Sequence, residues 1–331
     1  MKPAGLVSLL VVSIACSRVL AAAPSTTPFD PPPPDPSQIA IVGTLPVELK
    51  ARRTKVGLLL VRPQINGQDA GWFILDTGAG MSCIDAQLAQ KLKLPEAGGV
   101  SARGSGGRKE TTLRKYESLT LGPVQIKDST VVELNLSAIA LAIGHPIDGI
   151  IGYECFLPAV YEVDFVGERV TIYDPKTYQL PASAATQPAT QPASQPMSPW
   201  QPITMYDRRP CTPASIEGHE PGLFLIDSGA TGFVTVHGPA VKKLKLLEGR
   251  DTSVTGFGGV GGIRAARSGK LNSFSIAARN LTGVPAMFSQ AEEGALADEA
   301  VQGIVGTQLL ERFRVIVDYQ GKRVALLAKE K

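Results

Sequence analysis

The sequence predicts a mostly β protein made of two lobes related by internal duplication, and three observations support this fold class. The run Phe-Ile-Leu-Asp-Thr-Gly-Ala at residues 73–79 returns 151 residues later as Phe-Leu-Ile-Asp-Ser-Gly-Ala at 224–230. Short apolar runs alternate with turn residues in both halves, which is typical of β-strands. Between the halves, residues 181–202 change to repeated Gln, Pro, Ala and Thr, which indicates a linker.

Length and composition fit a globular protein with two cores. The chain has 331 residues, of which 44% are hydrophobic and 19% are charged. It carries 33 Lys and Arg against 30 Asp and Glu, and two of the basic residues lie in the first 23 positions. The remainder is therefore close to neutral, which argues against a nucleic-acid-binding protein.

Residues 1–23 are interpreted as an export signal. Lys2 precedes an apolar core at Leu6–Ala15, and Ala21–Ala23 offers small residues for cleavage. Cys16 also lies in a context that resembles a lipoprotein-processing site, where it would become a lipid-bearing N-terminus and the one attachment to a membrane. Both interpretations predict an exported protein, periplasmic or secreted, and the apolar run is too short to span a bilayer.

The domain organisation follows from these changes in composition. Residues 24–38 are rich in proline and are expected to form an extended tether. Lobe one is expected at 39–180, the linker at 181–202 and lobe two at 203–331.

In lobe one, a strand at Val56–Val61, a tight turn at Asn66-Gly67 and a strand at Gly71–Leu75 lead into Asp76. Ile84, Leu88 and Leu92 have helical spacing, which predicts a short amphipathic helix before Pro95. Further strands are expected at Leu119–Ile126, Val131–Leu134, Val160–Phe165 and Arg169–Tyr173.

Lobe two repeats this plan, with a helical stretch at Val241–Leu247. Its strands are expected at Ala214–Ile216, Leu223–Ile226, Leu271–Ile276 and Val284–Phe288, and the run Ile304-Val305-Gly306 is followed by a pair at Val315–Asp318 and Val324–Leu327.

Each duplicated run delivers a carboxylate from an apolar strand into a turn. A single buried carboxylate is costly, but two that lie together can share a proton, because repulsion between like charges raises one pKa. Asp76 and Asp227 are therefore the candidate catalytic pair. Gly78 and Gly229 lack a Cβ, so the two turns can approach closely.

The chain resembles the pepsin and retropepsin superfamily of aspartic peptidases. Lobe one has Asp76-Thr77-Gly78 and later Ile150-Ile151-Gly152, and lobe two has Asp227-Ser228-Gly229 and later Ile304-Val305-Gly306. The spacing from Asp to the later Gly is 76 residues in lobe one (76 to 152) and 79 in lobe two (227 to 306). The doubled, ordered pair of motifs is more specific than a single Asp-Thr-Gly.

The resemblance implies retropepsin-like or pepsin-like β-barrel lobes with the active cleft between them. It implies an endopeptidase for peptide or protein substrates, favoured by acid pH, in which a water activated between Asp76 and Asp227 hydrolyses the bond without a covalent intermediate or cofactor. It also implies that the hydroxyls of Thr77 and Ser228 bond across to the opposite lobe.

Two glycine-rich segments are candidates for flaps that close over a bound peptide. The first contains Gly104, Ser105, Gly106 and Gly107, and the second contains Gly256, Phe257 and Gly258. The second also matches the dinucleotide-binding pattern through Gly261. Because no apolar helix follows and no acid occurs before Glu292, a nucleotide site is rejected.

One position departs from the family. Gly80 stands where the family usually has Ser, Thr or Asp, whereas lobe two has Thr231 at the matching position. A hydrogen bond near Asp76 could be lost, so a second hypothesis is a catalytically weak relative that binds peptides or proteins without cutting them. A monomer is expected, although the linker also allows lobes to pair between chains.

The remaining reactive residues indicate no metal site. The chain has neither Cys-x-x-Cys nor His-Glu-x-x-His. The family fold packs the segments of Cys83 and Cys155 side by side, so a disulfide between them is a hypothesis, with two buried thiols as the alternative. Cys211 would be the odd thiol of the exported chain.

Overall fold

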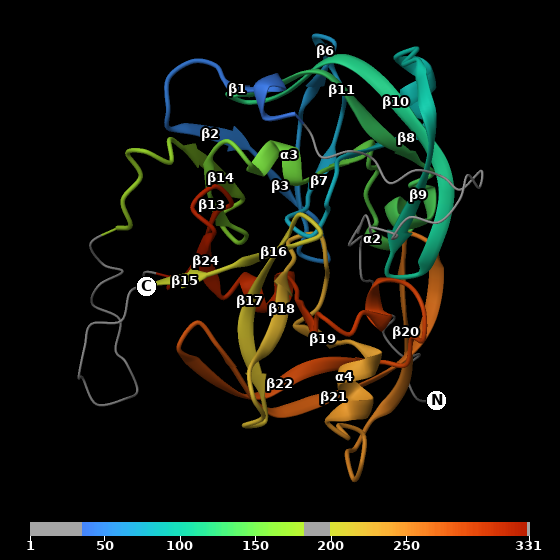
Figure 1. The fold of residues 1–331 in the computed structure, drawn as a ribbon, viewed down its shortest axis with the longest axis vertical. Coiled ribbons are helices and arrows are strands. Elements are labelled where there is room, and N and C mark those ends of the chain that lie inside the picture. The colour runs from blue at the N-terminus through green and yellow to red at the C-terminus, as the bar shows by residue number, and fades with distance from the viewer. Residues whose placement is uncertain (1–34, 182–198, 330–331) are drawn as a thin grey trace, which may run out of the picture.

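The computed structural model describes residues 35–181 and 199–329 (Figure 1). The expected export signal, Cys16, most of the tether and most of the linker lie outside these residues. Strands make up most of the described chain, which confirms the mostly β prediction. Figure 1 shows lobe one above lobe two.

Lobe one is built on a sheet of 11 strands in the order β3-β4-β7-β12-β8-β11-β10-β5-β6, with β1 beside β11 and β9 beside β10. The strands are β1 (Ile39–Ile41), β3 (Arg52–Arg53), β4 (Leu59–Val61), β5 (Gln64–Ile65), β6 (Gln68–Asp69), β7 (Phe73–Leu75), β8 (Cys83–Asp85), β9 (Glu96–Gly104), β10 (Gly107–Leu121), β11 (Val124–Leu134) and β12 (Gly149–Ile151). The helices are η1 (Pro36–Gln38), α1 (Ala86–Lys91), α2 (Ser137–Ile143) and α3 (Tyr153–Phe156).

Lobe two is built on a sheet of eight strands in the order β16-β17-β18-β23-β19-β22-β21-β20, with a further pairing between β17 and β21. The strands are β16 (Thr204–Tyr206), β17 (Arg209–Ile216), β18 (Gly222–Ile226), β19 (Val234–Val236), β20 (Ser253–Gly259), β21 (Gly262–Ile276), β22 (Arg279–Ser289) and β23 (Gly303–Val305). The helices are α4 (Gly238–Lys243), η3 (Ala295–Ala297) and α5 (Thr307–Leu310).

The two lobes share one pairing scheme around their central strands. In lobe one, β7 runs parallel to β12, β12 antiparallel to β8, and β8 parallel to β11. In lobe two, β18 runs parallel to β23, β23 antiparallel to β19, and β19 parallel to β22. The repeat seen in the sequence is therefore a repeat of topology.

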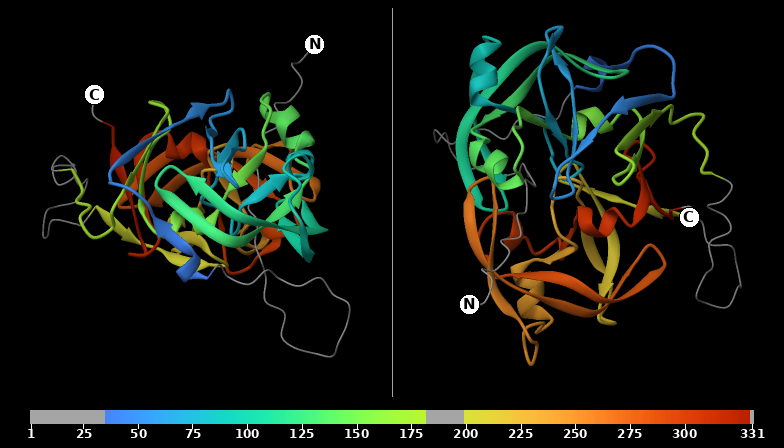
Figure 2. Two further views of the ribbon diagram at one scale, coloured as in Figure 1. Left: turned by 90° about the horizontal axis from the view of Figure 1, so that it is seen from above. Right: turned by 180° about the vertical axis from the view of Figure 1, so that it is seen from behind.

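A third sheet of six strands joins the lobes, in the order β15-β25-β24-β13-β14-β2. Its strands are β2 (Val47–Lys50), β13 (Val160–Asp164), β14 (Arg169–Tyr173), β15 (Trp200–Pro202), β24 (Phe313–Asp318) and β25 (Arg323–Ala328). The β13–β14 and β24–β25 hairpins were expected to finish one lobe each, but β13 pairs directly with β24. Figures 1 and 2 show the green and red strands of this sheet side by side.

The same turn closes both hairpins of this shared sheet. Asp164 accepts a hydrogen bond from the N–H of Gly167, and Asp318 accepts one from the N–H of Gly321. Each carboxylate also pairs with an arginine at the start of the next strand. The repeat thus extends into the strands that hold the lobes together.

Several expected boundaries were wrong. The run 119–126 is not one strand, because Gly122 adopts φ +56° and, with Pro123, turns the chain between β10 and β11. The helix expected at 241–247 is α4, three residues earlier, and α2 was not anticipated. The last residues of the expected tether and of the expected linker have regular structure. Asp35 caps η1 at the end of the tether, and residues 200–202 at the end of the linker form β15 against β25.

The disulfide hypothesis was wrong. Cys83 and Cys155 are buried but not joined in a disulfide bond, and they belong to different hydrophobic clusters. Cys83 packs with Leu60 and Ile74 on one side of the lobe-one sheet, and Cys155 packs with Phe156 on the other. Burial raises the pKa of the Cys155 thiol, which makes it less reactive.

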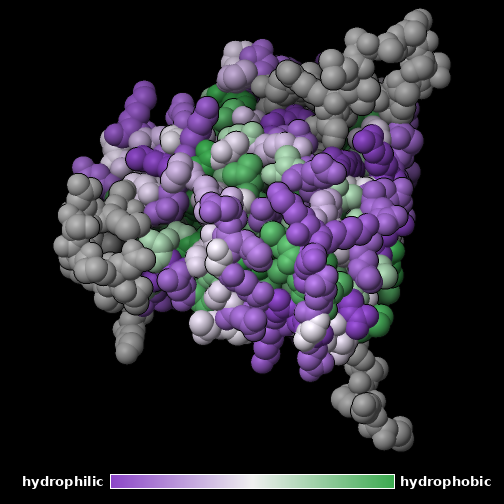
Figure 3. Space-filling model, turned by 60° about the horizontal axis from the view of Figure 1, so that its bottom comes forward, coloured by the Kyte–Doolittle hydropathy of each residue, from purple (hydrophilic) through white to green (hydrophobic). Residues whose placement is uncertain are grey.

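The surface gives no sign of an extended apolar patch on the face shown in Figure 3, which is largely hydrophilic with small hydrophobic areas. The large hydrophobic residues exposed in the described chain are Val42, Leu141, Val166, Val254 and Ile263. No helix in the ranges 35–181 and 199–329 has the length and apolar character needed to cross a membrane.

The shared sheet predicts a cost for truncating its core. Ile316 on β24 is fully buried against Val160 of lobe one and Ala325 and Leu327 of lobe two. Ile316→Ala should lower the free energy of unfolding by about 2–5 kcal/mol, measured by urea denaturation. The matched control Val166→Ala, at a site 63% exposed, should change it by less than about 0.5 kcal/mol. Equal effects of the two variants would contradict the shared core.

Candidate active site

Two loops, one from each lobe, carry the duplicated acids. β7 ends at Leu75, and the N–H of Asp76 donates to the carbonyl of Ile151 on β12 at 3.0 Å. In lobe two, the N–H of Asp227 donates to the carbonyl of Val305 on β23 at the same distance. The neighbouring parallel strand therefore fixes where each acid leaves the sheet.

Hydrogen bonds between the loops hold them in one arrangement. The hydroxyl of Thr77 donates to the carbonyl of Ile226 at 2.7 Å, and that of Ser228 donates to the carbonyl of Leu75 at 2.6 Å. Each hydroxyl also accepts from the other residue's backbone N–H at 2.9 Å. All four bonds cross from one lobe to the other, so they fix the separation of the acids.

The glycines allow this close approach. A Cβ on Gly78 would lie 2.4 Å from Cγ of Asp227, and a Cβ on Gly229 would lie 2.1 Å from Cγ of Asp76. Such distances are far inside van der Waals contact, so any larger residue would push the loops apart. Each glycine N–H also donates to Oδ1 of its own lobe's aspartate, at 2.8 and 2.9 Å.

Asp76 and Asp227 are fully buried and lie within hydrogen-bonding reach of each other. In the described part of the chain, Oδ2 of either carboxyl accepts no hydrogen bond from another residue. Burial raises the pKa of both groups, and the negative charge of Asp227 raises that of Asp76 further. The pair therefore favours a state with one proton, which supplies an acid and a base together.

Tyr319 supports the lobe-one loop from the shared sheet, a role that was not anticipated from the sequence. It follows β24 directly, is buried, and donates its hydroxyl to the carbonyl of Thr77 at 2.8 Å. Its ring stacks on Phe156, with ring centroids 5.3 Å apart. The matching residue of lobe one is Phe165, which has no hydroxyl, so this support is given by lobe two alone.

The two glycine-rich segments form hairpins whose tips meet. Gly104 and Gly107 flank the turn between β9 and β10, and Gly259 and Gly262 flank the turn between β20 and β21. The N–H of Gly106 donates to the carbonyl of Val260 at 2.9 Å. On the right of Figure 1, the two hairpins approach each other from opposite lobes.

Side chains near the tips strengthen this contact. Val260 is almost fully buried and packs into a hydrophobic cluster of lobe one, while Ser105 and Phe257 are fully buried. Arg264 donates to the carbonyl of Gly106 at 2.9 Å, and Arg103 donates to the carbonyl of Gly294 at 2.7 Å. The hairpins thus bridge the lobes in a closed arrangement.

The counterpart of Gly80 in lobe two makes no hydrogen bond to the active loop in this structure. This residue, Thr231, is buried, and its hydroxyl has no hydrogen-bond partner within the described residues. Asp227 thus gains no bond from Thr231 that Asp76 would lack.

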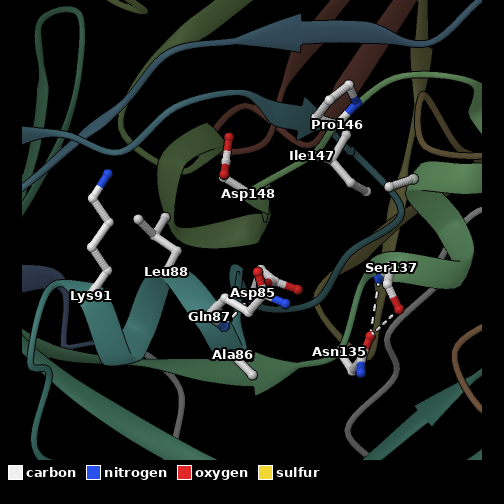
Figure 4. Close-up of a pocket in the computed structure, with 11 residues that line it drawn as sticks. Asp85, Ala86, Gln87, Leu88, Lys91, Asn135, Ser137, Pro146, Ile147 and Asp148 are labelled. Atoms are coloured by element: carbon white, nitrogen blue, oxygen red, sulfur yellow. Dashed lines mark hydrogen bonds between the residues drawn. The ribbon is translucent and has the colours of Figure 1, made fainter.

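A surface pocket of about 340 Å³ lies in lobe one between α1 and residues 146–148 (Figure 4). Its acids are already engaged, since Asp85 accepts from the N–H of Gln87 and Asp148 accepts from that of Trp72. Its lining includes neither active loop. In the described ranges, no group of three or more His, Cys, Asp or Glu is placed to hold a metal ion.

Comparison with known proteins agrees with this geometry. A family model described as "Aspartyl protease" matches the chain twice, at residues 61–155 and 212–309. The first segment contains Asp76 and the second Asp227. No curated protein matches the chain.

The hydroxyl bonds between the loops predict a large effect of removing one of them. Thr77→Val leaves the carbonyl of Ile226 and the N–H of Ser228 buried without partners, at about 1–3 kcal/mol for each group. We expect the free energy of unfolding to fall by at least about 2 kcal/mol in urea denaturation. Thr77→Ser keeps the hydroxyl, so its free energy of unfolding should fall by less than half as much. A similar loss in both variants would contradict a dominant contribution of the hydroxyl, because Thr77→Val keeps the methyl group and Thr77→Ser keeps the hydroxyl.

The raised pKa values of the pair predict how stability depends on pH. Asp76 holds its proton more tightly in the folded than in the unfolded chain, so its contribution is fully present below about pH 4 and is lost as pH rises through the folded pKa. Asp76→Asn does not titrate, so its stability relative to wild type should increase between pH 4 and 8 by at least about 1.4 kcal/mol. A flat difference between Asp76→Asn and wild type over this pH range would contradict the pairing.

Proposed function

Because this chain belongs to the aspartyl protease family, we propose that it is an aspartic endopeptidase that uses a water activated between Asp76 and Asp227. The observation that carries the proposal is the pair of buried carboxyls, one from each lobe, locked together by reciprocal hydroxyl bonds. Such a pair can hold a single proton and supply a general acid and a general base at the same site.

The proposed reaction needs only these two groups and water. The ionised carboxylate takes a proton from the water as the water oxygen attacks the carbonyl carbon of the scissile peptide bond. The protonated carboxyl donates its proton to the carbonyl oxygen of the same bond. The resulting tetrahedral intermediate collapses: the carboxyl that became protonated in the first step gives its proton to the amide nitrogen, the C–N bond breaks, and the other carboxylate takes a proton from one hydroxyl of the intermediate. The products are a carboxylic acid and an amine, and the pair again holds one proton.

The substrate would be a peptide bound in extended form between the active loops and the hairpin tips. In the closed arrangement Ser105 and Val260 are buried, so the tips must separate before a peptide can reach the acids. Closure would then exclude water other than the reacting molecule and strengthen the electrostatic interactions inside.

We propose that activity is highest at acid pH and declines as pH rises through the pKa of the carboxyl that holds the shared proton. On residues 1–23 alone, we also propose that the protein acts outside the cytoplasm, in the periplasm or as a secreted protein. The hypothesis of a peptide-binding relative that does not cut rested on Gly80. The peptidase is preferred because both acids of the pair are present and buried, and the cleavage assay below separates the two hypotheses.

Cleavage of a peptide library between pH 3 and 8 tests the proposal. Asp76→Asn and Asp227→Asn should each lower kcat/KM by at least about a hundredfold, because each removes either the general acid or the general base. Pepstatin should inhibit the wild type, and the surface variant Asp251→Asn should keep full activity. Activity that survives either active-loop substitution would rule out the shared mechanism, and a wild type that binds peptides without cutting them would favour the binding relative.

A further inference from the structure

The two carboxyls have different neighbours on the adjacent strand. β4 pairs antiparallel with β7, with Leu60 opposite Ile74, and continuing this register by two residues places Leu58 opposite Asp76. β17 pairs antiparallel with β18, with Cys211 opposite Leu225, and the same continuation places Arg209 opposite Asp227.

Leu58 and Arg209 occupy equivalent positions in the duplication. Each lies 18 residues before its aspartate (58 to 76 and 209 to 227). Directly opposite residues of an antiparallel pair point to the same face of the sheet, so Leu58 shares a face with Asp76 and Arg209 shares a face with Asp227. The charge of Arg209 acts on Asp227. Leu58 is fully buried among hydrophobic residues, and Arg209 is 4% exposed. One carboxyl therefore has an apolar neighbour and the other a cation.

The cation is held in place by a small network in lobe two. Nη2 of Arg209 lies 3.7 Å from Oδ2 of Asp207, and its guanidinium lies over the ring of Tyr206 at 5.7 Å. Tyr206 donates its hydroxyl to Asp298 at 3.1 Å, and Arg103 of the first hairpin pairs with the same carboxylate at 3.5 Å. These contacts limit the directions that the arginine can take.

Other ionisable groups near the pair do not cancel this difference. Burial raises the pKa of Asp207, so this carboxyl is less able to neutralise the charge of Arg209. Burial lowers the pKa of His237 to about 4, so its imidazole carries no charge above that pH. The ionisable groups that act on the two carboxyls or on the side chains packed around them are Arg103, Asp207, Arg208, Arg209, Cys211, His237, Asp298 and Tyr319, together with Tyr153 beside Tyr319.

We propose that Arg209 is a positioning residue for the shared proton: it keeps Asp227 ionised, as the base, and leaves the proton on Asp76, as the acid. The positive charge beside Asp227 favours its ionised form, whereas the apolar Leu58 beside Asp76 favours the neutral form. Consistent with this, burial raises the pKa of Asp227, and the charge of Arg209 opposes that effect together with hydrogen bonds from Asp76 and from the N–H of Gly229. The assignment of base and acid rests on the proposed peptidase function, but the assignment of the proton does not.

Titration of each carboxyl alone tests the proposal without any cleavage assay. In protein labelled with ¹³C at the Asp carboxyls, Asp76→Asn leaves Asp227 and Asp227→Asn leaves Asp76, and each signal is identified by its absence from the other variant. We expect Asp227 to titrate at least about one pH unit below Asp76. Equal values, or the reverse order, would overturn the proposal.

Replacing the arginine then identifies the cause. Added to Asp76→Asn, Arg209→Met should raise the pKa of Asp227 by about one unit or more, while Arg209→Lys should restore most of the difference. Added to Asp227→Asn, Arg209→Met should shift the pKa of Asp76 much less. Leu58→Met, added to either Asn variant, should leave the pKa of the remaining carboxyl close to its value in that Asn variant alone. An equal shift of both carboxyls would assign Arg209 a general structural role.

Two further measurements keep the outcomes distinct. If Arg209→Met does not fold, Asp207→Asn removes the negative neighbour of Arg209 and should lower the pKa of Asp227; an increase would contradict the proposal. In an active enzyme, Arg209→Met should move the acid limb of the kcat/KM profile to higher pH. An inactive protein with the expected titrations would refute the peptidase but not the assignment of the proton.

Discussion

The structure depends on holding two carboxyl groups, one from each lobe, close together in a buried site. Asp76 and Asp227 would repel each other if both were ionised, and each would be costly to bury alone. The hydroxyls of Thr77 and Ser228 prevent the loops from separating, and the glycines beside them leave room for the opposite carboxyl. A shared proton is the arrangement that satisfies both constraints. The chemistry of the site is thus a consequence of its packing.

The active loops also depend on a framework that lies outside them. The six-stranded sheet takes strands from both lobes, and Tyr319, which directly follows its strand β24, donates to the carbonyl of Thr77. A change in how β13 pairs with β24 would therefore reach the loop of Asp76 through a single hydroxyl. On the opposite side, the hairpin tips join the lobes again through Gly106 and Val260. The two carboxyls lie between these two connections.

The sequence predicted the duplicated features well because they repeat in order. The acids, their glycines and the strands that lead into them follow from the two motifs, and the hairpins of the shared sheet were placed within a residue or two. The run 119–126 was misjudged because its apolar pattern continues across the turn at Gly122, although Pro123 inside it was a warning. That the hairpins pair with each other across the lobes could not be predicted, since no local pattern specifies a partner so far along the chain.

Features that differ between the lobes were harder to predict than those that repeat. Tyr319 corresponds to Phe165 and Arg209 to Leu58, and neither member of a pair is unusual by itself. Aligning the two halves at the offset of 151 residues would have exposed the second pair, because both positions precede their aspartate by the same distance.

The contrast between Leu58 and Arg209 has a consequence for how such a protein can evolve. In a dimer of identical subunits, rotational symmetry gives both acids the same surroundings, and any substitution beside one appears beside the other. Joining two copies in one polypeptide removes that restriction, so that each half can mutate on its own. Here the two copies have kept the same architecture and have diverged at the position that decides which acid carries the hydrogen.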